Sequence, residues 1–353
     1  MPEVLSGVPL APRTTLRLGG PARTLVEAAT EAELVEAVRG ADAAGEPLLV
    51  LAGGSNVVIA DAGFDGLVVR VATTGVRREA GADGRERLTV AAGEPWDAVV
   101  AGAVADGLAG IECLSGIPGS TGATPIQNVG AYGQEVASTI TSVRVLDRRT
   151  GTVEEPPPAA CGFAYRSSGF KHAAGHVVLA VTFELERSDS SGPLRYGELA
   201  RSLGLEPGAG APLADVRDTV LALRRGKGMV LDAADHDTWS AGSFFTNPVL
   251  EADAFAALEA RAGAPPPRFP EPDGRIKTSA AWLIERAGFT KGDARGPVAL
   301  SSKHALALTN RGGATAEGLV GFAREIAAQV ERQLGVALVP EPVLVGLSWP
   351  ADG

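Results

Sequence analysis

Two glycine-rich segments have the composition that a phosphate-binding loop needs. Residues 53–61, GGSNVVIAD, and residues 114–133, LSGIPGSTGATPIQNVGAYG, each come directly after an apolar segment. Glycine leaves the backbone amides bare, so phosphate oxygens can approach them without interference from side chains. The first segment alone is more typical of an ordinary structural turn than of a ligand loop. The second adds hydroxyl and amide side chains that make a poor core and a good polar cradle, which favours a dinucleotide diphosphate as ligand.

Neither segment has the spacing G-x-G-x-x-G, and this disfavours a standard Rossmann fold. Other candidate residues each have a plain structural alternative. Ser243 precedes two phenylalanines in GSFFTNP, but no Gly-x-Ser-x-Gly elbow surrounds it, so a hydrolase nucleophile is disfavoured. Arg166 and Lys171 in FAYRSSGFK are also consistent with solvated surface residues, and Glu341 with a surface carboxylate between two prolines.

The histidines lack a recognisable metal-ligand spacing, so we expect no metal site; they are His172, His176, His236 and His304. Cys113 and Cys161 are expected to be free, mostly buried thiols, as in a reducing compartment.

Length and composition narrow the class of protein. A chain of 353 residues predicts two or three domains. No apolar run approaches the ~18 residues of a membrane helix, and the N-terminus lacks a secretory pattern, so we expect a soluble, cytoplasmic protein without membrane insertion. A net charge of −10 argues against a nucleic-acid partner, although local basic residues can still hold a diphosphate or a carboxylate.

Helical and strand patterns alternate irregularly, which favours an α+β architecture. Thr30 and Glu33 form a capping box before a helix, and Thr315 and Gly335 delimit a late helix with one apolar face. We also expect a helix from near Pro95, helices over Asp215–Arg225 and Ala254–Ala262, and strands over Leu48–Leu51, Ser142–Asp147 and Val177–Leu185.

Taken together, the chain resembles the UDP-N-acetylenolpyruvoylglucosamine reductase family. The resemblance runs over nearly the whole chain, in order, through TTLRLGGPA (14–22), GGSNVVIAD (53–61), LSGIPGSTGATPIQNVGAYGQE (114–135), YRSSGFK (165–171), AGSFFTNP (241–248), AAWLIERAGFTKG (280–292) and GVALVPEPVLVG (335–346).

The resemblance implies an FAD-binding region of the vanillyl-alcohol-oxidase type followed by a smaller α+β substrate-binding domain. The expected boundaries are 1–72 and 73–214 for the two FAD-binding subdomains and 215–345 for the substrate domain, with the tail 346–353 returning to the first subdomain. FAD is expected to bind noncovalently, because no histidine precedes His172.

The resemblance also implies an activity and roles. NADPH reduces the flavin, which then reduces UDP-N-acetylglucosamine enolpyruvate to UDP-N-acetylmuramate. Arg166 and Glu341 match residues that stabilise the developing negative charge, and Ser243 matches the proton donor. Substrate contacts carry over to Tyr196, Arg224, Lys227 and Asn247.

The two loops are expected to supply the FAD contacts. These are Gly53, Gly54, Ser55, Asn56, Ile117, Pro118, Gly119, Ser120, Gly122, Ala123, Ile126, Asn128, Gly130 and Ala131.

This chain departs from the family pattern in three places. Ala281 replaces a frequent Gly, Val339 replaces a frequent Glu, and an insert, DAADHDTW (232–239), precedes Ser243. Two other functions remain open at this stage. One is a flavin oxidase of the same wider fold, which NADPH-driven bleaching of the flavin without oxygen would disfavour. The other is a nonenzymatic nucleotide-binding protein, which a colourless preparation would favour.

Overall fold

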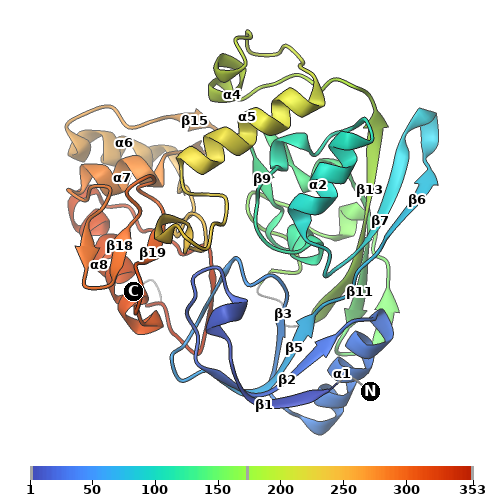
Figure 1. The fold of residues 1–353 in the computed structure, drawn as a ribbon. Helices are drawn as coiled ribbons and strands as arrows, with labels where there is room; N and C mark the ends of the chain where they lie inside the picture. The colour runs from blue at the N-terminus through green and yellow to red at the C-terminus, as the bar shows by residue number, and fades with distance from the viewer. Residues whose placement is uncertain (1–2, 172–174, 351–353) are drawn as a thin grey trace. The chain divides into compact units, whose positions relative to one another are not determined.

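The computed structural model describes residues 3–171 and 175–350, and the chain divides into two compact units (Figure 1). Unit 1 comprises Met1–Val8, Ala22–Gly54 and Phe64–Val230. Unit 2 comprises Pro9–Pro21, Ser55–Gly63 and Leu231–Gly353. His172 lies outside the described residues. Within residues 3–171 and 175–350, no helix is long and apolar enough to cross a membrane.

The first sheet of unit 1 has the strand order β1-β2-β5-β3, in which β2 and β3 both run parallel to β5. Its strands are β1 (Val4–Pro9), β2 (Pro21–Ala28), β3 (Leu48–Leu51) and β5 (Phe64–Val71). Helix α1 (Glu31–Ala44) connects β2 to β3 and buries Leu34 and Val38 in the same core as Val69. The expected capping box of Thr30 and Glu33 is confirmed. Strand β3 also forms as expected, but only Leu51 of it is fully buried.

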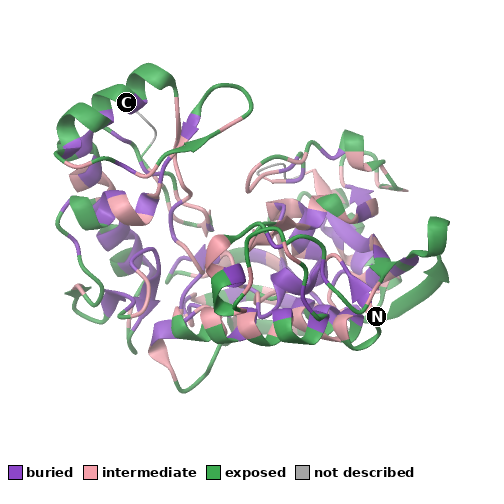
Figure 2. Ribbon diagram, turned by 90° about the horizontal axis from the view of Figure 1, so that it is seen from above, coloured by how far each residue is buried: buried purple, intermediate pink, exposed green. Residues whose placement is uncertain are grey.

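The second sheet of unit 1 is antiparallel, with the order β12-β11-β13-β7-β6. Its strands are β6 (Val76–Ala80), β7 (Glu86–Ala91), β11 (Ile140–Asp147), β12 (Thr152–Glu154) and β13 (His176–Arg187), and the short β8 (Leu108–Ala109) also pairs with β13. Helix α2 (Trp96–Ala105) begins directly after its N-cap Pro95, near the expected start, and the Trp96 ring lies 5.5 Å from that of Phe183 on β13. Buried residues follow the inner strands, whereas β6 is exposed along its whole length (Figure 2).

The second glycine segment contains more regular structure than its glycine content predicts. Its short elements are a 3-10 turn (Thr121–Ala123), α3 (Thr124–Gln127) and β9 (Gly130–Ala131), and β9 pairs with β10 (Gln134–Glu135) directly after the segment. Pro125 stands in the first turn of α3, where its missing N–H costs no hydrogen bond. The glycines of this segment are therefore compatible with regular structure, because the elements are short.

A smaller core in unit 1 holds α4 (Gly197–Ser202) against α5 (Leu213–Gly226). Leu199, Val216 and Val220 share this core with Cys113. Cys113 and Cys161 are both free and buried, as expected. Burial raises the pKa of each thiol, and Glu112 adds to this effect at Cys113.

Unit 2 packs helices α6 (Ala252–Ala262), α7 (Ala280–Arg286) and α8 (Ala316–Leu334) around one core with three small sheets. The sheets have the orders β14-β16-β15, β17-β18-β19 and β20-β4, with strands β4 (Val57–Ile59), β14 (Val249–Leu250), β15 (Phe269–Pro270), β16 (Ile276–Lys277), β17 (Ala294–Arg295), β18 (Val298–Leu300), β19 (Leu308–Asn310) and β20 (Val343–Val345). Helix α8 starts at the Thr315 cap and ends at Gly335 in the left-handed conformation, as expected.

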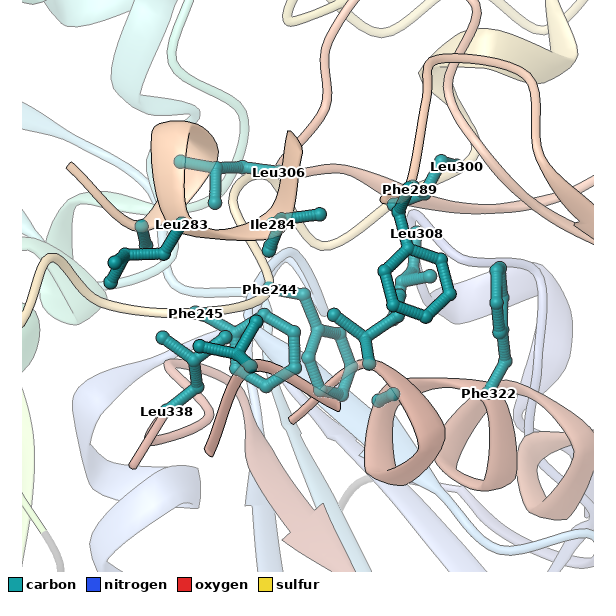
Figure 3. Close-up of a cluster of buried hydrophobic side chains, with 14 of the residues drawn as sticks. Phe244, Phe245, Leu283, Ile284, Phe289, Leu300, Leu306, Leu308, Phe322 and Leu338 are labelled. Carbon is teal, nitrogen blue, oxygen red and sulfur yellow. The ribbon is translucent and has the colours of Figure 1, made fainter. Parts of the chain in front are cut away.

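The core of unit 2 centres on aromatic side chains (Figure 3). Phe244 and Phe245 stack edge to face at 5.2 Å, and Trp349 lies 6.0 Å from the Phe245 ring. Helix α5 belongs to unit 1, although the expected substrate domain begins at residue 215. The division of the chain into three domains stays a prediction.

Candidate functional site

The two glycine-rich loops meet backbone to backbone in unit 1. A Cβ atom on Gly53 would lie 2.6 Å from the Cα atom of Gly119, a distance that real side chains do not reach. Gly119 has a φ of +118° and accepts a hydrogen bond of 3.0 Å from the backbone N–H of Trp96. Bare backbone at the meeting point is what a flavin dinucleotide requires of its phosphate loops, and these loops therefore fit FAD.

Part of the second loop is anchored by its own amides. The Thr121 N–H donates to the Glu94 carbonyl and the Gly122 N–H to the Ala92 carbonyl, each at 2.8 Å. A Cβ on Gly122 would lie 2.6 Å from the Ala92 Cβ, so this glycine serves close packing. Of the other predicted cofactor residues, Ser120 and Asn128 are buried. Ile117, Ile126 and Ala131 pack against the core of unit 1. All the predicted FAD contacts stay predictions.

The first loop divides between the units. Gly53 and Gly54 belong to unit 1, whereas Ser55 and Asn56 belong to unit 2. Within unit 2 the Asn56 side-chain amide donates to the Glu341 carbonyl at 3.4 Å. The GGSN sequence is thus followed within a few residues by β4, whose partner strand β20 comes just after Glu341.

Arg166 stands in a tight turn whose ends, Ala164 and Ser167, exchange backbone hydrogen bonds of 2.9 and 3.1 Å. Its backbone φ is +51°, in the left-handed region that non-glycine residues rarely adopt. The guanidinium donates from Nη2 to the Gly130 carbonyl at 2.6 Å and from Nη1 to the Asn128 carbonyl at 3.5 Å. The structure therefore brings Arg166 to the end of the second glycine loop.

Three of the four predicted substrate residues gather in unit 1 around Tyr132. The Tyr196 ring meets the Tyr132 ring edge to face at 5.3 Å, and the Lys227 Nζ lies 5.8 Å from the Tyr132 ring centre. Lys227 also forms an ion pair of 2.6 Å with Glu198. Burial lowers the pKa of Arg224 to about 10, with opposing effects from Tyr132 and Asp97, so the residue is still charged at neutral pH.

We name this group the Tyr132 cluster: Tyr132, Tyr196, Glu198, Arg224 and Lys227. The buried Nε atom of Arg224 has no hydrogen-bond partner among residues 3–171 and 175–350. A cluster with two cations and two phenols is suited to an anionic group such as a diphosphate. Sequence reasoning missed Tyr132 and Glu198, although Tyr132 lies within the second glycine loop and Glu198 only two residues after Tyr196.

An ion pair supports the start of the same loop. Asp97 on α2 accepts the Gly116 N–H at 2.6 Å and pairs with Arg217 on α5 at 2.7 Å. Burial alone would raise the pKa of Asp97, but the hydrogen bonds from Arg217 and Gly116 more than offset it, and the pKa lies below its ordinary value. Asp97 therefore links α2 to α5 by an ion pair and to the loop by a hydrogen bond.

In unit 2, Ser243 and Glu341 lie on neighbouring segments. The Glu341 N–H donates to the Phe244 carbonyl at 2.8 Å, and Phe245 forms an antiparallel bridge with Pro340. On its other side the Phe244 N–H donates to the Leu306 carbonyl at 2.7 Å. Ser243 is half-buried and directly precedes Phe244, which is held by these two backbone hydrogen bonds.

The side-chain oxygen of Asn247 accepts the Ala280 N–H at 3.0 Å, at the start of α7. This contact has a structural purpose, and the predicted substrate role of Asn247 stays a prediction. Arg166 belongs to unit 1 and Ser243 and Glu341 to unit 2, so the convergence of these three residues also stays a prediction. Within residues 3–171 and 175–350, no group of three His, Cys, Asp or Glu side chains is placed to hold a metal ion.

The insert 232–239 is a folded element of unit 2. Its centre is a 3-10 turn, His236–Thr238, and the His236 ring packs against that of Trp239, tilted by 44°, with 4.2 Å between the ring centres. The buried Asp237 accepts hydrogen bonds from the Ser302 N–H at 2.9 Å and the Ser302 hydroxyl at 2.6 Å, and it pairs with Arg311 at 2.7 Å. The segment leading to Ser243 is therefore fixed to the small sheet and its loops.

Comparison with known proteins assigns the family. Residues 234–345 match the C-terminal domain of UDP-N-acetylenolpyruvoylglucosamine reductase, and residues 22–155 match an FAD binding domain. The UDP-N-acetylenolpyruvoylglucosamine reductase of Streptomyces coelicolor is 57% identical over 98% of this chain and 91% of its own length. That of Thermobifida fusca is 55% identical over 97% of this chain and 98% of its own length.

The chain belongs to the UDP-N-acetylenolpyruvoylglucosamine reductase family. A crystal structure of UDP-N-acetylenolpyruvylglucosamine reductase from Thermus caldophilus superimposes with a TM-score of 0.66 at 25% identity, covering 98% of this chain and 99% of that one. These matches confirm the family expected from the sequence and its α+β fold with an FAD-binding region. The vanillyl-alcohol-oxidase type of that region stays a prediction. The chain is an FAD-dependent oxidoreductase.

Proposed function

We propose that this chain reduces UDP-N-acetylglucosamine enolpyruvate to UDP-N-acetylmuramate in peptidoglycan precursor synthesis, with NADPH as the hydride donor. The observation that supports this most is the reductase-domain match over residues 234–345, which contains both Ser243 and Glu341. The FAD-binding match over residues 22–155 contains both glycine loops.

When bound in the two glycine loops, FAD would supply hydride transfer from NADPH to the methylene carbon of the enolpyruvyl group. Addition of that hydride leaves an electron pair on the adjacent carbon, delocalised into the carboxylate. Positive charge and hydrogen-bond donors must stabilise this anion. Arg166 supplies a cation that is held at the loop end by the Gly130 and Asn128 carbonyls.

Ser243 then completes the reduction by donating its hydroxyl proton to the carbanionic carbon. A hydroxyl is a weak acid, but the enolate-like intermediate is strongly basic. Glu341 carries or shares a proton in this proposal, because a bare carboxylate would oppose the developing charge. The backbone bond between Glu341 and Phe244 keeps the Glu341 and Ser243 segments in register.

The Tyr132 cluster is proposed to bind the diphosphate of the substrate. Lys227 and Arg224 provide the positive charge, and Tyr196 provides an aromatic ring and a phenol at the edge of the cluster. Asn247 is proposed to add a further polar contact. FAD is proposed to bind noncovalently in the two glycine loops.

The test is anaerobic stopped-flow absorbance of the flavin in wild type and Ser243→Ala. NADPH is expected to reduce both proteins equally. Reoxidation by the enolpyruvyl substrate is expected to slow by roughly 10²- to 10⁴-fold in the variant, the usual contribution of a general acid. Ser348→Ala is the matched control, since Ser348 is an exposed serine of the same unit. Equal reoxidation rates would remove Ser243 as the acid, and failure of NADPH to reduce wild type would remove the proposed activity.

A further inference from the structure

The carboxylate of Glu135, which is not among the predicted site residues, lies at the same loop as the Arg166 guanidinium. Strands β9 and β10 pair so that Glu135 stands opposite Gly130. The Arg166 Nη1 lies 3.8 Å from the Glu135 Oε1, while its Nη2 donates to the Gly130 carbonyl at 2.6 Å. The guanidinium therefore contacts both strands of this small hairpin.

Gly130 makes this arrangement possible. A Cβ atom at this position would lie 2.8 Å from the Arg166 Nη1 and 2.8 Å from the Glu135 Cγ. A larger residue here would force the Arg166 guanidinium or the Glu135 side chain to shift. The absence of a side chain at Gly130 thus allows the two charged side chains to approach each other closely.

The second carboxylate oxygen of Glu135 is linked through a hydrogen-bonded amide to the turn that carries Arg166. The Asn128 Nδ2 donates to the Glu135 Oε2 at 3.1 Å and to the Ala164 carbonyl at 2.9 Å. Asn128 is buried and in the left-handed conformation, with a φ of +43°. One carboxylate therefore contacts the Arg166 side chain directly and its backbone turn through a buried amide.

We infer that Glu135 is a positioning residue for Arg166, which it holds in the orientation that meets the carboxylate of the substrate. This inference rests on the proposed function of Arg166. The two carbonyl acceptors fix where the guanidinium nitrogens lie, and the carboxylate fixes the hairpin and the turn relative to each other. Glu135 contributes a charge at one side of the guanidinium and leaves the chemistry to Arg166.

The experiment compares wild type with Glu135→Ala and Glu135→Gln. The glutamine keeps an oxygen for the Asn128 amide but removes the charge. Glu135→Ala is expected to slow reoxidation at saturating substrate by about 10- to 100-fold, the effect of a misplaced catalytic group. Reduction by NADPH, flavin retention and the unfolding midpoint are expected to stay at wild-type values. Glu135→Gln is expected to recover most of the lost rate.

The matched control is Glu155→Ala, which removes an exposed carboxylate of unit 1 that pairs with Arg144 at 2.8 Å. It is expected to reoxidise as wild type does. In an Arg166→Ala background, Glu135→Ala is expected to have no further effect, because the residue that it positions is gone. A full multiplicative loss in that background would overturn the inference, as would a wild-type rate in Glu135→Ala.

A readout independent of turnover separates this inference from the proposed function. The guanidinium ¹⁵N signals of Arg166, assigned by their absence in Arg166→Ala, are expected to report restricted rotation in wild type and free rotation in Glu135→Ala. Unchanged signals in Glu135→Ala would overturn the positioning role even if the enzyme turns over. Restricted signals in a wild type that the enolpyruvyl substrate does not reoxidise would overturn the proposed function alone.

Discussion

The two units hold their candidate catalytic residues by different means. In unit 1, the Arg166 guanidinium is placed by side-chain contacts: its own bonds to two carbonyls, the Glu135 carboxylate and the Asn128 amide. In unit 2, Ser243 and Glu341 are placed by main-chain hydrogen bonds to and from Phe244, whose ring is buried in the aromatic core.

This contrast determines which kind of substitution each residue tolerates. A position held by charged side chains responds to single substitutions that leave the fold intact, because each contact depends on one functional group. A position held by backbone bonds over a packed core responds to the volume of the core. Catalysis and stability should therefore separate in unit 1 and fall together in unit 2.

The largest expected effect is that of Phe244→Ala. Truncation of a buried phenylalanine costs about 3–5 kcal/mol of unfolding free energy. We expect urea unfolding to show this loss and the folded fraction to reoxidise slowly, because the segment that carries Ser243 loses its anchor. Phe289→Ala is the control, since its ring lies in the same core against Phe322 at 6.1 Å and away from Ser243 in sequence. Wild-type reoxidation in Phe244→Ala would show that the core does not place Ser243.

An intermediate effect is expected of Asp237→Asn, which tests whether charge also supports unit 2. Hydrogen bonds to a charged group are worth about 1.5–3 kcal/mol, so the variant should lose about 2 kcal/mol at pH 7. Burial raises the pKa of Asp237, but the hydrogen bonds from Ser302 more than offset it and the pKa is lowered overall.

The sign of the pH dependence follows from that lowered pKa. The stabilisation by the Asp237 carboxylate is present above the unfolded pKa of about 3.9 and is lost as the pH falls through the lower folded pKa. The deficit of Asp237→Asn in urea unfolding should therefore shrink between pH 7 and pH 3. Asp232→Asn, an exposed position of the same insert, is the control. A deficit that does not change with pH would contradict the charge contribution.

The smallest effect is expected of Glu198→Gln in the Tyr132 cluster. Glu198 pairs with Lys227 at 2.6 Å and so competes with any anion that Lys227 binds. Partly exposed ion pairs are worth roughly 0–1 kcal/mol, so UDP should bind up to about fivefold more tightly to the variant. Isothermal titration at low salt measures this, with the exposed Glu206→Gln as control. Weaker binding would show that Glu198 helps to form the site.

Local patterns in the sequence predicted the elements well. The Thr30 and Glu33 capping box depends on two side chains within one turn, and the Thr315 to Gly335 helix depends on a cap residue at each end; both are confirmed. The sequence also predicted that Tyr196, Arg224 and Lys227 act together, through resemblance to the family, and the structure brings them together around Tyr132.

Local sequence patterns could not predict contacts between residues that are far apart in the sequence. The bond from Asn128 to Ala164 joins residues 36 positions apart, and nothing local to Glu135 marks it as a neighbour of Arg166. The contact of Asn247 could not be predicted for the same reason. Its side chain accepts the Ala280 N–H only because the fold places the start of α7 beside it. Close approach at Gly53 and Gly130 likewise depends on pairs of segments that meet only in the fold.

The pairing of β4 with β20 has a consequence for the synthesis of the chain. Val57 pairs with Val343, so 286 positions separate the two strands. At roughly 5–20 residues per second, a ribosome needs about 15–60 s to make the second strand after the first. During that time the three apolar residues of β4 have no partner strand, and the nascent chain presents an open edge on which chaperones can act and neighbouring chains can aggregate.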